Sequence, residues 1–171
     1  CSDGEVARWR ETSSPAGVFL DKVGHYLAEG FIPIALGVRA TGGLAELDST
    51  NLQYVAMGLL LSVLVLFNKA LNDMVHVARA FNGLPKLSES PEVAKPTSTA
   101  LAKLRSVVRL VPFNRIFHSV EMTLLIAVAA SLDYVFDDLL ATQRLLVLML
   151  IAAAVTVIGH LVAILNSSRL R

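Results

Sequence analysis

A regular series of polar side chains near the N-terminus contains residue types that can do chemistry. Asp21 follows Gly17 by four positions, and His25 and Glu29 follow at further intervals of four. Residues four apart share one face of a helix, so Asp21, His25 and Glu29 are predicted to form one stripe.

A second set of such residues, Asp3, Gly4 and Arg8, lies upstream of a spacer with Ser-Ser-Pro at positions 13–15. This spacer is typical of a turn, so we expect two helix ends to face each other, each offering a carboxylate. Mg²⁺ prefers oxygen ligands and commonly binds through carboxylates together with substrate phosphates, and a guanidinium binds phosphate. The pattern therefore predicts a site for a divalent cation and a pyrophosphate.

The spacing resembles the motif of the CDP-alcohol phosphatidyltransferase family, Asp-x2-Asp-Gly-x2-Ala-Arg-x8-Gly-x3-Asp-x3-Asp. Six residues match that motif at every spacing: Asp3, Gly4, Ala7, Arg8, Gly17 and Asp21. Two positions depart from it. The family's first Asp would precede Cys1, so we expect the sequence to begin inside the motif, and His25 stands where the family has its last Asp. The resemblance is specific over residues 3–25 and only architectural beyond them.

The resemblance implies an enzyme of phospholipid biosynthesis. Such an enzyme transfers a phosphatidyl (substituted phosphate) group from a CDP-linked lipid, such as CDP-diacylglycerol, to a small alcohol and releases CMP. It also implies Mg²⁺ or Mn²⁺ held on the pyrophosphate by Asp3 and Asp21. Nucleotide and phosphate contacts would come from four further residues: Gly4, Ala7, Arg8 and Gly17. Family members are homodimers of six transmembrane helices whose site opens to the cytoplasm, so this chain is expected to hold the last four helices.

His25 determines what the resemblance implies for activity, because the family's last Asp is thought to be the general base. Imidazole can accept a proton near neutral pH, but it binds Mg²⁺ poorly. We therefore expect that His25 acts as the base beside Asp21, or that it marks a catalytically weakened or inactive relative. Glu29 would be placed to take over the role of the missing carboxylate, and a purely structural His25 is the remaining interpretation.

The composition predicts an all-α integral membrane protein. Hydrophobic residues make up 54% of the 171, and the mean hydropathy is +0.61, whereas roughly 45–50% apolar residues are typical of soluble domains. The net charge of +1 does not favour nucleic-acid binding. The single cysteine, Cys1, excludes an internal disulfide framework. We expect residues 1–171 to form one polytopic helix bundle.

Apolar runs of helical length predict four membrane spans, at residues 17–40, 52–80, 112–136 and 143–165. Between the second and third spans, residues 83–111 are predicted to form a long loop. The end of this loop alternates apolar and basic residues, which is typical of an amphipathic helix on anionic lipid or of an ordinary solvated helix.

Basic residues predict how the spans are oriented. Residues 83–111 and the C-terminal tail contain Lys and Arg, whereas the connections at 41–51 and 137–142 contain neither. The positive-inside rule therefore places residues 83–111, the tail and the stretch at 3–25 on the cytoplasmic side.

The second predicted span changes from apolar to polar halfway along. Lys69 and Asp73 are four apart and are predicted to pair and to face a water-filled cavity. His76 and Arg79 would line the same cavity or protrude into solvent. An acceptor phosphate would be bound by three basic residues: Lys69, Arg79 and Arg115.

Two other functions fit parts of the sequence. Four histidines fall in the cytoplasmic halves of the predicted spans: His25, His76, His118 and His160. Facing histidines can ligate haem between helices, so a haem-binding bundle is one alternative, and a transporter-like bundle is another. Neither explains the Asp-Gly-Ala-Arg residues, so the transferase is the main prediction.

Overall fold

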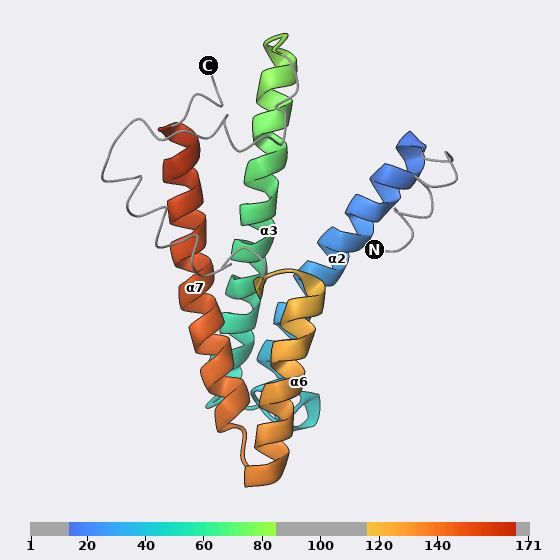
Figure 1. Cartoon of the computed structure of the whole chain (residues 1–171). Coiled ribbons are helices and arrows are strands. Elements are labelled where there is room, and N and C mark those ends of the chain that lie inside the picture. The colour runs from blue at the N-terminus through green and yellow to red at the C-terminus, as the bar shows by residue number, and fades with distance from the viewer. Residues whose placement is uncertain (1–13, 85–115, 167–171) are drawn as a thin grey trace.

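The computed structural model describes residues 14–84 and 116–166, and these residues form helices without strands. Four α-helices run along the bundle in Figure 1. Their bounds are α2, Pro15–Arg39; α3, Leu52–Phe81; α6, Ser119–Phe136; and α7, Leu140–Leu165. A single 3-10 turn, η1 (Leu44–Glu46), lies in the connection between α2 and α3. This architecture agrees with the predicted all-α bundle.

The helix bounds follow the predicted spans closely except at the start of α6. The third span was predicted from residue 112, but α6 begins at Ser119, because His118 has an extended backbone (ψ 148°) and acts as its N-cap residue. Residues 112–115, and most of the predicted loop and amphipathic helix at 83–111, lie outside the described residues.

The start of α2 follows local signals, since Ser14 caps it by accepting a hydrogen bond from the Gly17 N–H and Pro15 occupies its first turn.

Three of the helices in the described ranges, α3, α6 and α7, are long and apolar enough to cross a membrane. This finding indicates an integral membrane protein. The remaining helix, α2, was also predicted as a span. It is long enough, but it carries more charged side chains than the other three helices carry in their apolar stretches. Every stretch of 18 residues within α2 contains three charged side chains, drawn from Asp21, Lys22, Glu29 and Arg39. Only its second half is apolar.

Helices α2 and α3 approach each other most closely where two glycines meet. A Cβ added to Gly37 would lie 2.7 Å from the Tyr54 carbonyl oxygen and 3.0 Å from the Gly58 Cα. A Cβ added to Gly58 would lie 2.7 Å from the Pro33 carbonyl oxygen. One helical turn away from this crossing, Ser62 Oγ donates to the Gly30 carbonyl oxygen at 2.8 Å. Small residues at helix contacts and hydroxyl bonds between helices are typical of membrane bundles.

The common core lies where all four helices meet. It is built from buried side chains of α2, α3, α6 and α7, represented by Leu36, Leu61, Met122 and Leu146. The outward faces of α6 and α7 are apolar as well, and side chains such as Ile151 are exposed there. A helix that is apolar on all sides requires an apolar environment, so these outward faces are suited to lipid.

One end of the bundle is closed by a buried carboxylate. Asp133 of α6 accepts hydrogen bonds from the backbone N–H groups of Ala141 and Thr142, and thereby satisfies the first turn of α7. The same carboxylate accepts a bond from the Thr142 hydroxyl and lies 3.5 Å from Arg39 Nη2. These contacts bring the end of α2 and the α6–α7 connection to the same end of the bundle.

Candidate functional site

The predicted polar stripe is present on α2. The Asp21 Oδ1 atom lies 3.7 Å from His25 Nε2, and His25 Nδ1 lies 3.8 Å from Glu29 Oε1. Exposure falls along the stripe, because the Asp21 side chain is 58% exposed and that of Glu29 only 5%. The stripe therefore leads from solvent at Asp21 to the interior of the bundle at Glu29.

Glu29 is the point at which three helices meet. Its Oε2 accepts a hydrogen bond from Lys69 Nζ of α3 at 2.8 Å. Its Oε1 lies 3.5 Å from the Nδ1 of His118, the N-cap residue of α6. Burial of a carboxylate is unfavourable unless a cation or donors compensate it, and Lys69 is the compensating cation here.

Asp73 forms a second, more exposed contact between α2 and α3. It accepts hydrogen bonds from Lys22 Nζ at 2.7 Å and from the Tyr26 hydroxyl at 3.0 Å. The predicted pairing of Lys69 with Asp73 is therefore wrong, since each residue bonds to a partner on α2 instead. Tyr26 also lies beneath the ammonium of Lys69, 5.0 Å from the ring centroid. Sequence reasoning missed Tyr26 and gave Lys22 no role, and their i, i+4 spacing was the available signal.

The other predicted residues of α3 lie further along the helix. His76 is exposed and Arg79 is buried. Lys69 and Arg79 are ten residues apart, which separates them by about 15 Å along the helix axis. The two members of the predicted acceptor group that lie on α3 are thus separated along the helix, and Lys69 bonds to Glu29. Of the two remaining histidines, His118 contacts Glu29 and His160 Nδ1 lies 2.8 Å from Asn68 Oδ1.

The Glu29 cluster, defined as Glu29, His25, Lys69 and His118, lies near the level at which α6 begins. Figure 1 shows this start part-way along the bundle, with α2 leaning away from α3 beyond it. The 18 residues of α6 span about 27 Å, and Leu52 to Lys69 on α3 covers about 26 Å. Both lengths approach the roughly 30 Å of a bilayer's hydrocarbon core. The cluster is therefore placed near one membrane boundary, and Asp21 lies beyond it.

The upstream half of the predicted site lies outside the described residues. It comprises Asp3, Gly4, Ala7 and Arg8, and Arg115 of the predicted acceptor group also lies outside the described residues. Gly17 belongs to the first turn of α2, where a Cβ would lie 3.3 Å from Ser14 Oγ. Within residues 14–84 and 116–166, no three His, Cys, Asp or Glu side chains are grouped to hold a metal ion. The juxtaposition of Asp3 and Asp21 stays a prediction.

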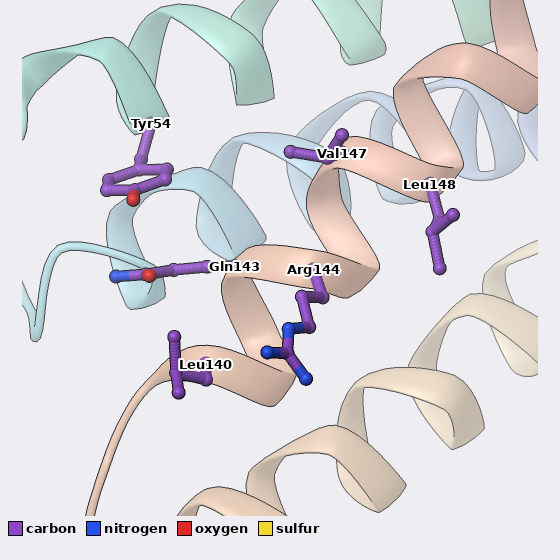
Figure 2. A pocket seen from close by; sticks show the side chains of 6 residues that line it. All are labelled: Tyr54, Leu140, Gln143, Arg144, Val147 and Leu148. Atoms are coloured by element: carbon purple, nitrogen blue, oxygen red, sulfur yellow. The ribbon is translucent and has the colours of Figure 1, made fainter.

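A shallow pocket lies between α3 and α7 toward the opposite end of the bundle. Its volume is about 440 Å³, and Figure 2 shows the Tyr54 ring of α3 beside the Gln143 side chain of α7. The lining is completed by Leu140, Arg144, Val147 and Leu148. None of these residues belongs to the predicted site, so the pocket and the polar stripe are separate features.

Comparisons with protein-family models, with curated proteins and with solved structures give no match for this chain.

Proposed function

We propose that this protein transfers a phosphatidyl group from a CDP-linked lipid to an alcohol and releases CMP. The observation that carries the proposal is the Asp-Gly-x2-Ala-Arg-x8-Gly-x3-Asp spacing from Asp3 to Asp21. Support comes from the place of Asp21 and His25 on one face of α2, at the charged end of a membrane bundle. A lipid donor and a water-soluble acceptor would meet at such a boundary.

The reaction asks the protein mainly to position groups and to neutralise charge. The acceptor oxygen forms a bond to the phosphorus that carries the lipid, and the bond from that phosphorus to the bridging oxygen breaks. CMP leaves with the electron pair of the broken bond. The hydroxyl proton passes to His25 and then to water. His25 suits this role because it is part-exposed and lies within reach of Asp21.

Mg²⁺ or Mn²⁺ would be held by Asp3 and Asp21. Asp21 fits this chemistry, because it offers an exposed carboxylate and these hard cations prefer oxygen ligands. When bound, the ion would neutralise the charge of the pyrophosphate. His25 is not assigned as a ligand, because imidazole suits this ion poorly.

The test is Mg²⁺-dependent CMP release by the purified full chain, with CDP-diacylglycerol as donor and a panel of small alcohols as acceptors. We expect Asp21→Asn and Asp3→Asn each to lower the rate about 100-fold or more, since each removes a group that stabilises transition-state charge. Asp48→Asn, in the connection at the other end of the bundle, is the matched control and should retain the rate. Equal rates in all three variants, or no release with any alcohol, would refute the proposal.

A catalytically inactive relative is the second candidate, and one observation favours it. His25 lies between two carboxylates at 3.7 and 3.8 Å, a position that also suits an ion-pair partner. His25→Asp, which restores the family's residue, separates the two candidates. Higher turnover in His25→Asp indicates a degenerate site, whereas loss of turnover indicates that the histidine is the base.

A further inference from the structure

The pocket between α3 and α7 has a cationic side chain at its edge. Arg144 is the charged residue among those that line the pocket, and its side chain is exposed. Figure 2 shows Arg144 between Leu140 and Leu148 along α7. These three residues are spaced four apart and therefore share one face of the helix. The pocket is thus a mainly apolar groove with a guanidinium beside it.

Arg144 has no partner within the part of the chain that the structure describes. Arg39, at the same end of the bundle, donates to Thr142 Oγ1 at 3.2 Å and lies 3.5 Å from Asp133 Oδ2. The N–H groups in the first turn of a helix can also bind an anion, but those of α7 are already bonded to Asp133 and Asp138. An anion in this pocket would therefore be recognised by the guanidinium of Arg144.

The pocket lies close to a membrane boundary. Helices α3 and α7 begin at this end, at Leu52 and Leu140. Tyr54 and Arg144 therefore lie about 3 Å and about 6 Å along their helices. Tyrosine is enriched at the level of the lipid headgroups, and a long arginine side chain near a helix end extends toward that level.

Exposed apolar side chains continue along α7 beyond Arg144, away from this boundary. Leu148, Ile151, Val155 and Ile158 recur at intervals of three and four, and their exposed fractions lie between 58% and 65%. They form one stripe that covers about 15 Å from Leu148 to Ile158. This length equals one leaflet, half of the roughly 30 Å of hydrocarbon in a bilayer. A cation followed by such a stripe matches a lipid phosphate followed by an acyl chain.

The charges around the groove favour a phospholipid without net charge. The connections at 41–51 and 137–142 contain acidic residues and no Lys or Arg. Asp138 lies next to the pocket, because its Oδ1 accepts a hydrogen bond from the Leu140 N–H at 3.1 Å. An anionic headgroup would be attracted by Arg144 but repelled by these carboxylates. A zwitterionic headgroup presents its phosphate to the guanidinium and its ammonium to the carboxylates.

A second copy of this chain is the competing occupant of the groove. Most homodimers have two-fold symmetry, so two copies packed along this stripe within one membrane would bring their Arg144 side chains to the same level. The repulsion of like charges opposes that arrangement, whereas a lipid phosphate complements the charge.

We infer that this groove binds one zwitterionic membrane phospholipid, with the phosphate at Arg144 and an acyl chain along Leu148 to Ile158. The groove lies at the end of the bundle opposite to Asp21 and His25. The inference therefore does not depend on the proposed transferase activity.

The test measures by fluorescence quenching which lipid contacts the groove. The full chain carries Trp9→Phe, which removes its single tryptophan, and Leu148→Trp as the reporter. Nanodiscs of an uncharged glycolipid without phosphate contain a small fraction of phosphatidylcholine with brominated acyl chains, which quench on contact. Val128→Trp is the matched control, because Val128 is exposed on α6. It is also as far from the end of α6 at Phe136 as Leu148 is from the start of α7.

We expect half-maximal quenching of Leu148→Trp at a mole fraction about two- to fivefold lower than that for Val128→Trp, the range expected for one exposed charge pair. Arg144→Gln should abolish the difference, and brominated phosphatidylglycerol should give a smaller one. Equal quenching at both positions, an unchanged result in Arg144→Gln, or a larger difference with phosphatidylglycerol would overturn the inference. Weaker quenching of Leu148→Trp than of Val128→Trp would overturn it in favour of a protein partner on the groove.

A second measurement keeps the native side chain at position 148 and decides the question if Leu148→Trp does not fold. Native mass spectrometry counts the phosphatidylcholine molecules that stay bound to the protein after its release from the mixed nanodiscs. We expect the wild-type chain to retain one more molecule than Arg144→Gln. Equal numbers on both proteins would refute the site.

Discussion

At the residue scale, two lysines form ion pairs between α2 and α3, and the two pairs differ in their exposure to solvent. The Lys69–Glu29 pair joins side chains that are 26% and 5% exposed, whereas the Lys22–Asp73 pair joins side chains that are 56% and 38% exposed. Exposed pairs contribute little because water solvates both charges before and after pairing. Removing one partner of a buried pair leaves a charge that water cannot reach.

We therefore expect Lys69→Met to destabilise the protein far more than Lys22→Met. The cost should approach the lower end of the roughly 3–5 kcal/mol seen for broken buried pairs, against about 0.2–1 kcal/mol for an exposed pair. Unfolding of both variants in detergent micelles, followed by circular dichroism, measures the difference. Equal loss of stability in the two variants would contradict the assignment of Glu29 as the buried partner.

Asp48 provides a pH-dependent contribution in the connection between α2 and α3. Hydrogen bonds from the Thr50 hydroxyl and from the Thr50 and Asn51 backbone N–H groups lower the pKa of Asp48 below its ordinary value of 3.8. The folded state therefore favours the ionised form, so this stability is present above pH 3.8 and is lost as the pH falls through the lowered pKa.

Asp48→Asn should reveal this contribution. We expect the difference in Tm between the wild type and Asp48→Asn to be largest near neutral pH and to disappear under strongly acidic conditions. Thermal unfolding across that range measures it. A difference in Tm that stays constant with pH would show that the charge of Asp48 has no stabilising role.

Single residues also show what could be predicted from the sequence. The stripe of Asp21, His25 and Glu29 follows from helical periodicity alone. The partners of Lys69 and Asp73 did not follow, because periodicity gives the face of one helix but not how that face is turned toward its neighbour. The i, i+4 rule favoured pairing within α3, whereas Glu29 and Lys22 on α2 provide closer opposite charges.

At the scale of elements, the crossing of α2 and α3 depends on the absence of side chains at Gly37 and Gly58. The added Cβ atoms would lie within 3.0 Å of the backbone of the other helix, and backbone cannot move aside as the end of a flexible side chain can. Further along the same two helices, Lys69 contacts Glu29 and Lys22 contacts Asp73.

We expect Gly37→Ala and Gly58→Ala each to destabilise the bundle by about 1–3 kcal/mol, as overpacking does. Gly24→Ala is the matched control on α2, because a Cβ there meets nothing within 4 Å. That control should gain up to about 1 kcal/mol from helix propensity. Melting of the three variants in lipid nanodiscs measures the effect, and unchanged stability of both crossing variants would show that the helices can separate at no cost.

The start of α6 shows where element boundaries escape sequence reasoning. Pro112 is a favourable first-turn residue and suggested a span from residue 112, yet α6 begins at Ser119. The contact of His118 with Glu29 is long-range and cannot be read from local pattern. The other three helices start or end within three residues of their predicted limits, because hydropathy and caps mark them locally.

At the scale of the whole molecule, hydropathy predicted the bundle well because an apolar run of sufficient length is a local property. Three helices qualify as spans by this measure. Hydropathy also suggested that α2 is a full membrane span. The apolar half of that helix, from Gly30 to Val38, covers only about 14 Å. Of the candidate site, the stripe on α2 was predicted from the sequence, whereas the contacts of Glu29 with Lys69 of α3 and with His118 required the structure.

The orientation of the bundle in the membrane is a prediction from the distribution of charge, and it is open to direct measurement. The connections at 41–51 and 137–142 lack Lys and Arg and meet at one end, where Gln143 Nε2 donates to the Ala40 carbonyl oxygen. In a Cys1→Ser background, we expect an impermeant maleimide to label Ala80→Cys only from the cytoplasmic face and Ser49→Cys only from the opposite face. Ala153→Cys, in the core, is the control and should react from neither. The reverse pattern would place Asp21 and His25 away from the cytoplasm, and labelling of both thiols from one face would show that α3 does not cross the membrane.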